Sequence, residues 1–319
     1  MKVSIIIVNW NGLDHLKDCL PSIEKQSYRD YEVIIVDNGS IDEGIDYVEK
    51  NFPQYKIIKN NKNLGFPKPN NQGIHIAKGE YILLLNNDTE LDRDFLKNYV
   101  EFAEQSEKDV GMFSCKMLFF NRRNGINSIG LNLYDDGSSI DEAFNEIDKG
   151  FNSSKEVFGP CGGAALFKKE ALEDIKIEDD YLDSDFFLYA EDTDLAFRLQ
   201  LRGWKCQYVP NAKVYHKVNA TTKKIPNVGV YHGHKNKIFL ILKNYPTSLL
   251  IKKSPKIILR QFISIFYYLT KFNLTPIKSR IAVIKLLPKM LKKRRIIQKS
   301  RTLSSKEVES LLKSKKFFM

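Results

Sequence analysis

The first third of the chain alternates short apolar runs with amphipathic segments. In chain order, the apolar runs and the helix-like segments between them are residues 4–10, 13–23, 31–37, 41–52, 55–60, 70–79 and 81–88. Short, continuous apolar strands separated by helices indicate a mostly parallel sheet that helices cover on both faces. We therefore expect an α/β nucleotide-binding architecture.

Polar residues follow three of these predicted strands, at residues 9–12, 37–40 and 86–89. In open α/β sheets, ligands bind beyond the carboxyl ends of the strands, so we expect the three loops to converge on one crevice. No G-x-G-x-x-G fingerprint follows the first strand, which argues against an NAD enzyme.

Composition limits the class of protein. With 319 residues and 43% hydrophobic content, the chain can bury a sizeable core. The four cysteines are far apart and form no C-x-x-C pair, which predicts neither a disulfide framework nor a zinc site and favours a reducing, cytoplasmic compartment. The first apolar run is too short for a signal peptide, and no run reaches the roughly 18 uncharged apolar residues of a membrane span.

The formal charge of +11 is unevenly distributed. Residues 251–319 contain 19 Lys and Arg against two Glu, a local charge of +17, so the remainder carries −6. Such a tail suits nucleic acid or an anionic membrane surface. Because it mixes Ile, Leu, Phe and Tyr with the cations, we expect amphipathic helices on a membrane and no nucleic-acid partner. A helical cap on the body or a homodimer interface is the alternative.

Two carboxylates follow predicted strands. In "VIIVDNGSID", Asp37 is either a turn residue or an acceptor for a nucleobase N–H or a ribose hydroxyl. In "YILLLNNDTEL", Asp88 can bind a hard divalent cation that also contacts a diphosphate. The alternative for Asp88 is to cap a helix that begins near Leu91.

Two loops carry glycines and amides. In "NLGFPKPNNQGI", Asn63 and Gly65 lie in a loop and Asn71 lies near a helix start, where amides and N–H groups suit a phosphate or a base edge. In "GPCGGAALF", the glycines allow a sugar or acceptor to approach the backbone of residues 161–163. Tight packing of a turn would explain the same glycines.

Three carboxylates crowd the start of a predicted helix in "YAEDTDLAFRLQLRGW". One acid satisfies a helix N-terminus, so Glu191, Asp192 and Asp194 together exceed the structural need. We expect Asp194 to lie in the first turn and to pair with Arg198 four residues later. Asp192, at or before the cap, would point into the crevice, and Gly203 would end the helix.

The histidines are less specific signals. His216 ends a strand-like run in "AKVYHKVN" and is either a metal or diphosphate contact or an ordinary surface residue. His232 and His234 have the spacing of a metal pair, although a phosphate-facing loop with Lys235 explains them equally well. We interpret His75 as a helix-surface residue.

Six motifs, in this order, resemble the family 2 glycosyltransferases with the GT-A fold, particularly the branch that includes rhamnosyltransferases. They are "VSIIIVNWNG", "VIIVDNGSID", "NLGFPKPNNQGI", "LLLNNDTEL", "GPCGGAALFKKEAL" and "YAEDTDLAFRLQLRGW", spread over roughly the first 205 residues. We expect a GT-A-type, mostly parallel sheet flanked by helices. Residues 1–115 would bind the nucleotide sugar, residues 116–245 would bind the acceptor and complete the site, and residues 246–319 would form the basic helical tail.

The resemblance also implies roles for individual residues. Asp37 would bind the base, Asp88 with His216 would bind Mg²⁺ or Mn²⁺ at the diphosphate, and Asp192 would be the general base, with Glu191 orienting the acceptor. The remaining expected donor contacts are Asn9, Asn63, Gly65, Lys68, Asn71 and Asn87. The expected acceptor contacts are Cys161, Gly162, Gly163 and Asp194. Lys68 stands between two prolines where many members have small residues, which suggests a phosphate contact.

The activity implied is an inverting, metal-dependent transfer of rhamnose or another hexose from a dTDP- or UDP-sugar. The acceptor would be a hydroxyl of a glycan or lipid-linked molecule in cell-surface polysaccharide synthesis, with the enzyme in the cytoplasm at the inner face of the membrane. The alternatives are a sugar nucleotidyltransferase, in which the "EDTDL" helix has no obvious part, and a non-catalytic nucleotide-fold protein with a basic tail that binds membrane or nucleic acid.

Overall fold

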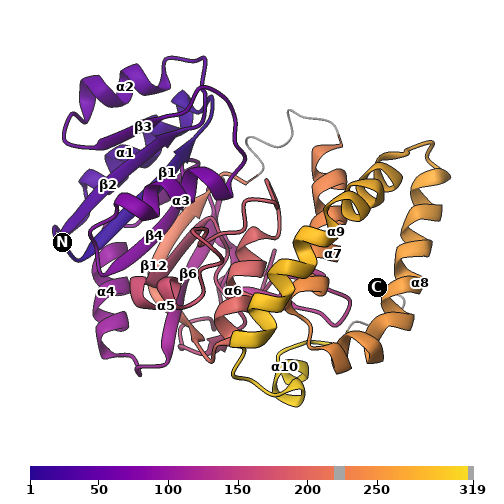
Figure 1. Ribbon diagram of the computed structural model, residues 1–319. Helices are drawn as coiled ribbons and strands as arrows, with labels where there is room; N and C mark the ends of the chain where they lie inside the picture. Colours follow the sequence, from indigo (N-terminus) through magenta and orange to yellow (C-terminus); the bar gives the residue numbers. More distant parts are fainter. Residues whose placement is uncertain (219–226, 315–319) are drawn as a thin grey trace.

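A computed structural model describes residues 1–218 and 227–314 (Figure 1). Its main sheet has the strand order β10-β12-β6-β11-β4-β1-β2-β3, with β5 paired to β12 and β7 paired to β6. These strands are β1 (Val3–Asn9), β2 (Tyr31–Asp37), β3 (Lys56–Lys59), β4 (Tyr81–Asn86), β5 (Thr89–Leu91), β6 (Val110–Phe119), β7 (Arg122–Ser128), β10 (Glu156–Val157), β11 (Ala164–Lys168) and β12 (Lys205–His216). The strands β8 (Leu131–Leu133) and β9 (Ser139–Asp141) form a separate hairpin.

Parallel pairing dominates the N-terminal half of the sheet, as predicted. β1 pairs parallel with β2 and β4, and β2 pairs parallel with β3. β11 runs antiparallel to both β4 and β6 and joins the two halves into one sheet. The register places Asn9 beside Asp37, and Val8 beside Asn86, so three loops leave the same edge of the sheet.

Helices cover both faces of the sheet. The helices α1 (Leu13–Glu24), α2 (Gly44–Asn51) and α4 (Phe95–Gln105) pack on one face, and α3 (Pro67–Ile76), α5 (Lys169–Asp174) and α6 (Glu191–Leu201) pack on the other. Alternate residues of β1 serve the two cores, because side chains in a strand point to opposite faces: Ile5 and Ile7 belong to one core and Ile6 to the other. The apolar runs therefore are strands buried on both sides.

Two predicted boundaries are wrong. Residues 89–91 form β5, and the helix expected near Leu91 begins at Phe95, because β12 supplies a pairing edge for β5 through His216 and Thr89. α3 begins at Pro67, three residues before the predicted start, where proline fits the first turn of a helix.

The described part of the predicted tail is helical and contains α8 (Thr247–Leu269), α9 (Thr275–Ser300) and α10 (Ser305–Ser310), and a further helix, α7 (Val228–Asn244), precedes it. Figure 1 shows these helices together at the end of the molecule opposite β3. The predicted division at residues 115 and 116 falls inside β6, and α7 packs mainly on α9. Residues 315–319 of the predicted tail lie outside the described residues. Within residues 1–218 and 227–314, no helix is long and apolar enough to cross a membrane.

Candidate active site

The ends of β1, β2 and β4 share one hydrogen-bonded cluster. The Asn9 Nδ2 group lies 3.5 Å from Asp37 Oδ1 and donates to Ser40 Oγ at 3.2 Å. Asn87 Nδ2 donates to Asn9 Oδ1 at 2.8 Å. Only glycine fits at position 12 beside these amides, because the Cβ of any other residue would lie 2.2 Å from Asn87 Nδ2. Asn9 is 0% exposed, so it positions Asp37 and Asn87 instead of contacting a donor as predicted.

The loop before α3 is tied to β2 by a residue that sequence reasoning missed. Asn38 Nδ2 donates to Asn63 Oδ1 (3.0 Å) and to the Gly65 carbonyl (2.8 Å). Gly65 has φ +84°, and a Cβ there would lie 2.4 Å from the Phe187 carbonyl oxygen. The glycine is therefore required by close packing of two loops. "DNG" signalled a turn, but the partners of Asn38 lie 25 and more residues away.

The two donor contacts expected on α3 have different surroundings in the structure. Asn71 is buried, and its amide donates to Asp180 Oδ1 (2.9 Å) and the Leu182 carbonyl (2.8 Å) and accepts the Leu182 N–H. The prediction that Asn71 binds the donor is wrong, because both ends of its amide hold the 180–184 loop. Lys68 is exposed at the start of α3.

Asp88 and His216 come together across the β5–β12 pairing. Asp88 Oδ1 lies 3.2 Å from His216 Nε2, and His216 Nδ1 lies 2.8 Å from Asn127 Oδ1. Burial alone would raise the pKa of Asp88, but the contact and charge of His216 hold it below its ordinary value. Asn127 was not foreseen, because β7 reaches this position only through its pairing with β6.

This pair fits a divalent cation. His216 Nδ1 faces the Asn127 oxygen, which only accepts, so a neutral ring would carry its proton on Nδ1 and turn the Nε2 lone pair toward Asp88 Oδ1. That oxygen is buried and has no hydrogen-bond donor unless the ring is protonated. In residues 1–218 and 227–314, no three His, Cys, Asp or Glu side chains are placed to hold a metal. Mg²⁺ commonly takes one or two protein carboxylates and completes its shell with phosphate oxygens and water.

The loop at residues 159–163 joins the donor strands to α6. The Asn86 N–H donates to the Gly163 carbonyl at 2.9 Å, and the Gly162 N–H donates to Asp192 Oδ2 at 3.1 Å. Added Cβ atoms would lie 3.1 Å from Asp192 Cβ at Gly162 and 2.9 Å from Met117 Cε at Gly163. These contacts favour the packing interpretation of both glycines. Cys161 is half-buried, and burial raises the pKa of its thiol.

α6 begins after a strained segment. Phe187, Tyr189 and Ala190 all have positive φ, between 62° and 69°. Ala190 is the N-cap, so Asp192 occupies the second helical position and not the cap or a preceding position as predicted. Its Oδ1 accepts the Thr193 N–H at 2.6 Å. Non-glycine residues keep such backbone angles only where their surroundings over-determine them.

The two leading carboxylates of α6 are both perturbed. Burial and the adjacent charge of Asp192 raise the pKa of Glu191 to about 8, and Glu191 Oε2 has no hydrogen-bond partner. Burial also raises the pKa of Asp192, against the opposing effect of the Gly162 and Thr193 N–H donors. Perturbed acids in a crevice are typical of catalytic sites.

Asp194 has a purely structural environment. It is 0% exposed, with Oδ2 accepting from Arg198 Nε (3.0 Å) and Oδ1 accepting from Lys243 Nζ (2.9 Å) and Asn244 Nδ2 (2.8 Å). The predicted Asp194–Arg198 pair is confirmed. The predicted acceptor contact is wrong, because the carboxylate is enclosed and every partner belongs to the fold.

The C-terminal helices α7 and α9 contact the start of α6 and the loop before it. Lys243 of α7 also contacts Asp183, and Lys293 of α9 contacts both Asp183 and Asp185. Asn236 Nδ2 donates to three carbonyl groups of the strained segment, those of residues 186, 188 and 189, at 2.7–3.0 Å. α7 and α9 are therefore part of the scaffold of the candidate site.

Neither alternative for His232 and His234 matches the structure, because both residues lie on α7 and their rings face different neighbours. The His232 ring stacks on Phe187 with centroids 5.0 Å apart, whereas His234 packs on Tyr268 of α8 at 5.3 Å. Lys235 does not face a phosphate loop, since its Nζ donates to the Asp185 carbonyl at 2.7 Å. His75 is exposed, as predicted.

Asp141 is a further carboxylate of the site that the sequence did not reveal. Burial and the charge of Asp192 raise its pKa, against the effects of Ser128, Cys161 and His216. Its Oδ1 atom has no hydrogen-bond partner. Asp141 ends β9, in a region without clear periodicity, so only the hairpin brings it beside the other acids.

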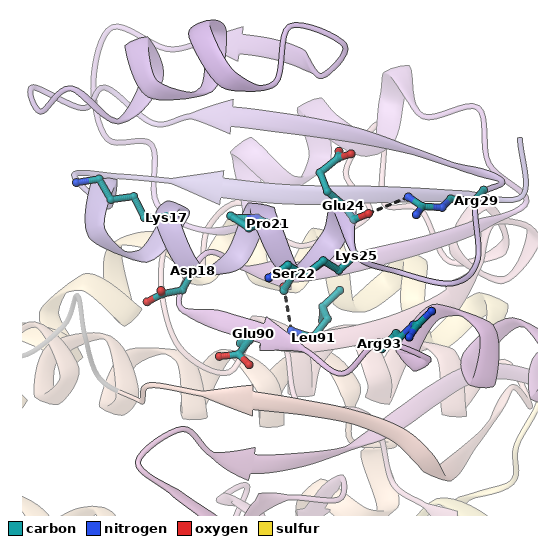
Figure 2. Close-up of a pocket in the computed structure, with 10 residues that line it drawn as sticks. All are labelled: Lys17, Asp18, Pro21, Ser22, Glu24, Lys25, Arg29, Glu90, Leu91 and Arg93. Atoms are coloured by element: carbon teal, nitrogen blue, oxygen red, sulfur yellow. Dashed lines mark hydrogen bonds between the residues drawn. The ribbon is translucent and has the colours of Figure 1, made fainter.

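A separate surface groove of about 650 Å³ lies between α1 and β5 (Figure 2). Its lining mixes acids with cations, and Figure 2 shows Ser22 Oγ accepting the Leu91 N–H at 3.0 Å. No predicted site residue lines it. We place the active site at the strand ends, where perturbed carboxylates and the Asp88–His216 pair converge.

The model of the family "Glycosyl transferase family 2" matches residues 4–176, more than half of the chain. The chain belongs to this family. Membership confirms the resemblance and favours glycosyl transfer over nucleotidyl transfer or a non-catalytic nucleotide-fold protein. The rhamnosyltransferase branch stays a prediction.

Relatives of this glycosyltransferase include a poly(ribitol-phosphate) beta-glucosyltransferase of Bacillus spizizenii, 32% identical over 183 residues, which are 56% of this chain and 26% of the relative. The poly(ribitol-phosphate) beta-N-acetylglucosaminyltransferase TarS of Staphylococcus aureus is 31% identical over 121 residues, 36% of this chain and 21% of TarS. The chain thus matches about a quarter or less of the length of these relatives.

Solved structures confirm the GT-A fold. The crystal structure of S. aureus TarS aligns with a TM-score of 0.54 at 19% identity and covers 76% of this chain and 40% of that chain. TarS residues 1–349 align with a TM-score of 0.52 at 18% identity over 98% of this chain and 83% of that chain.

The raised pKa of Glu191 predicts a pH-dependent effect of Glu191→Gln. The native pKa of about 8 exceeds the ordinary value of 4.5, so the stabilisation from protonated Glu191 is complete below about pH 4.5 and is lost as the pH rises to about 8. Gln cannot ionise. We expect the melting temperature of the variant, relative to the parent, to rise progressively from about pH 5 to pH 8.5. Thermal unfolding across this range measures it, with the exposed Glu101→Gln as control; a constant difference would contradict the prediction.

Lys243→Met tests the buried ion cluster. The substitution removes the cation between two carboxylates that are both 0% exposed, so we expect a loss of about 3–5 kcal/mol in the free energy of unfolding. Lys252→Met breaks a pair in which the lysine is 62% exposed and should cost no more than about 1 kcal/mol. Urea denaturation of both variants measures the contrast, and equal losses would show that the cluster is not stabilising.

Proposed function

We propose that this glycosyltransferase moves a sugar, with inversion, from a nucleoside diphosphate to an acceptor hydroxyl, with Asp192 as general base. The loop at residues 159–163 supports this most directly. Its adjacent residues Gly163 and Gly162 are hydrogen-bonded to Asn86 and Asp192 respectively, and so tie the diphosphate side to the base. In an inverting displacement, base and leaving group act on opposite faces of the sugar.

The donor side is built on Asp37 and the Asn38–Asn63 contact. Asp37 is 6% exposed at the end of β2, and Oδ2 accepts the Ser40 N–H at 3.2 Å, which leaves it as an acceptor for a base N–H or a ribose hydroxyl. A crystal structure of TarS residues 1–349 contains UDP. Together with family membership, this favours a UDP-sugar donor over a dTDP-sugar.

Asp88 and His216 would hold Mg²⁺ or Mn²⁺ against the diphosphate. The cation supplies charge neutralisation as negative charge develops on the leaving group. The chain's own contribution is orientation: the β5–β12 pairing brings the two side chains together, and the contact with Asn127 Oδ1 would favour the ring tautomer in which Nε2 can bind the cation.

On the acceptor side, Asp192 takes the hydroxyl proton as the new glycosidic bond forms. Two N–H donors, from Gly162 and Thr193, fix the direction of its carboxylate. Glu191, with a pKa of about 8, is protonated near neutral pH and can donate to an acceptor oxygen. Asp141 has an oxygen without a partner and would accept from a second acceptor hydroxyl.

The acceptor class follows from chemistry and from the relatives. Several adjacent carboxylates suit a polyhydroxylated molecule, because each oxygen can accept from a sugar or polyol hydroxyl. The printed names of the relatives describe sugar transfer to poly(ribitol-phosphate). We propose a glycan or lipid-linked acceptor in cell-surface polymer synthesis, with a hexose, including rhamnose, as the transferred sugar.

Asp192→Asn tests the base. Asn keeps the shape, and its single oxygen can still accept one of the two N–H groups, that of Gly162 or that of Thr193, but it cannot take a proton. We expect turnover to fall by roughly two to four orders of magnitude while the fold and donor-induced thermal stabilisation persist. Release of UDP or dTDP from a panel of donor sugars measures turnover.

Asp179→Asn, in an exposed part of the preceding loop, is the matched control and should turn over like the parent. Asp194→Asn should lower the melting temperature, because it weakens the pairs with Arg198 and Lys243. A folded, donor-binding Asp192→Asn variant that turns over at the parent rate would remove Asp192 from the chemistry.

Asp88→Ala tests the cation. We expect most of the activity to be lost, and Mn²⁺ binding in the presence of UDP, followed by electron paramagnetic resonance, to weaken by at least about tenfold. Asp109→Ala, at an exposed ion pair with Lys205, should change neither readout. Full turnover of the parent in excess chelator would contradict metal dependence.

A further inference from the structure

α8 exposes a continuous apolar face. Leu249 is its only buried residue among those described, although most of its sequence is hydrophobic. The exposed side chains recur with helical spacing along one side, and each is 47–70% exposed: Ile258, Leu259, Phe262, Ile263, Phe266 and Tyr267. Exposed apolar faces of this kind mark interaction sites in folded proteins.

Exposed apolar side chains also occur in the turn after α8 and in the first half of α9. Phe272, in the connecting turn, is 96% exposed, and Ile277, Ile281 and Ile284 are 37–70% exposed along the first half of α9. Figure 1 shows α8 as the outermost element on its side of the molecule, with the α8–α9 turn at its end. We call this surface the α8–α9 face.

The charges of these helices divide into two groups. On the side of α8 turned to the body, Lys256 pairs with Asp135 at 2.7 Å and Arg260 pairs with Asp136 at 2.6 Å. These cations attach the helix to the protein and are not available to a ligand. The predicted use of the whole basic tail at a membrane is therefore too broad.

The second group lies along the α8–α9 face. Lys271, Lys278 and Lys285 are exposed beside the apolar residues, and no ion pair joins them to an acid in residues 1–218 and 227–314. α8 and α9 contain no Asp or Glu at all, from residue 247 to residue 300. The face thus combines apolar side chains with uncompensated positive charge.

This combination decides between two occupants. A second copy packed symmetrically on the same face would bring two acid-free, cationic surfaces together, and their charges would repel. An anionic bilayer offers both an apolar interior and negative headgroups. Neither helix can span a membrane, so the helices would lie in its surface.

We propose that the α8–α9 face binds the surface of an anionic lipid bilayer, with Phe262, Phe266 and Phe272 inserted at the boundary between headgroups and acyl chains. The inference does not depend on the proposed catalytic chemistry. Because α9 also contacts Asp183 through Lys293, the docked helices would hold the active site at a fixed position over the bilayer.

Flotation of the full chain with vesicles tests the proposal. We expect binding to vesicles of phosphatidylcholine with about 30% phosphatidylglycerol and little binding to phosphatidylcholine alone. The double variant Phe262→Ser/Phe266→Ser should reduce the partition coefficient at least about tenfold, since it removes two large apolar side chains from the contact. Lys278→Glu/Lys285→Glu should reduce it by a similar factor on the anionic vesicles alone.

Ile147→Ser, at a residue that is 56% exposed on the body, is the matched control and should float like the parent. Unchanged melting temperatures establish that each variant is folded. Absence of binding to anionic vesicles, equal binding to both vesicle types, or undiminished flotation of Phe262→Ser/Phe266→Ser would overturn the proposal. So would a parent dimer that this variant converts to a monomer in light scattering, because a second copy would then cover the face.

Discussion

The buried ion cluster around Lys243 is the interaction on which the arrangement of the site most depends. Lys243 and the carboxylates of Asp183 and Asp194 are all 0% exposed, so each charge relies on the others for the solvation that it has lost. The three residues come from α7, the loop before α6, and α6 itself. Lys293 adds α9 to the same cluster. Buried ion pairs consequently join α7 and α9 to α6 and to the loop before it.

This cluster explains why three acids stand together at the start of α6. Both carboxylate oxygens of Asp194 accept hydrogen bonds inside the protein, and these bonds anchor α6. Asn236 fixes the strained backbone just before it, so that Glu191 and Asp192 emerge at a defined place beside Gly162. Neighbouring residues of the same type thus have different tasks: Asp194 stabilises the fold, and Asp192 serves in the chemistry proposed above. The raised pKa values of the two leading acids are the cost of placing them in a site from which water is largely excluded.

The fold was largely predictable because its N-terminal half is encoded locally. β2 spans the predicted residues, and β1 and β4 differ from their predicted ranges by no more than two residues at either end, since each strand is a continuous apolar run bounded by turn residues. The prediction failed at Leu91, which pairs with Val214 in β12, more than a hundred residues away. The hairpin that ends at Asp141 was missed for the same reason. Contacts between distant segments decide such regions, and no local period records them.

For the site, the sequence by itself determined which residues stand at the strand ends: Asp37 and Asp88 follow apolar strands, and any parallel sheet must bring those ends to one edge. Tertiary structure decided what each polar group does there. Asn9 and Asn71 carry amides of the kind that contact ligands, yet both amides make their hydrogen bonds inside the protein. His216 meets Asp88 only because β12 pairs with β5. A side chain's chemistry is local, whereas its free hydrogen-bonding capacity depends on which distant groups the fold has already placed against it.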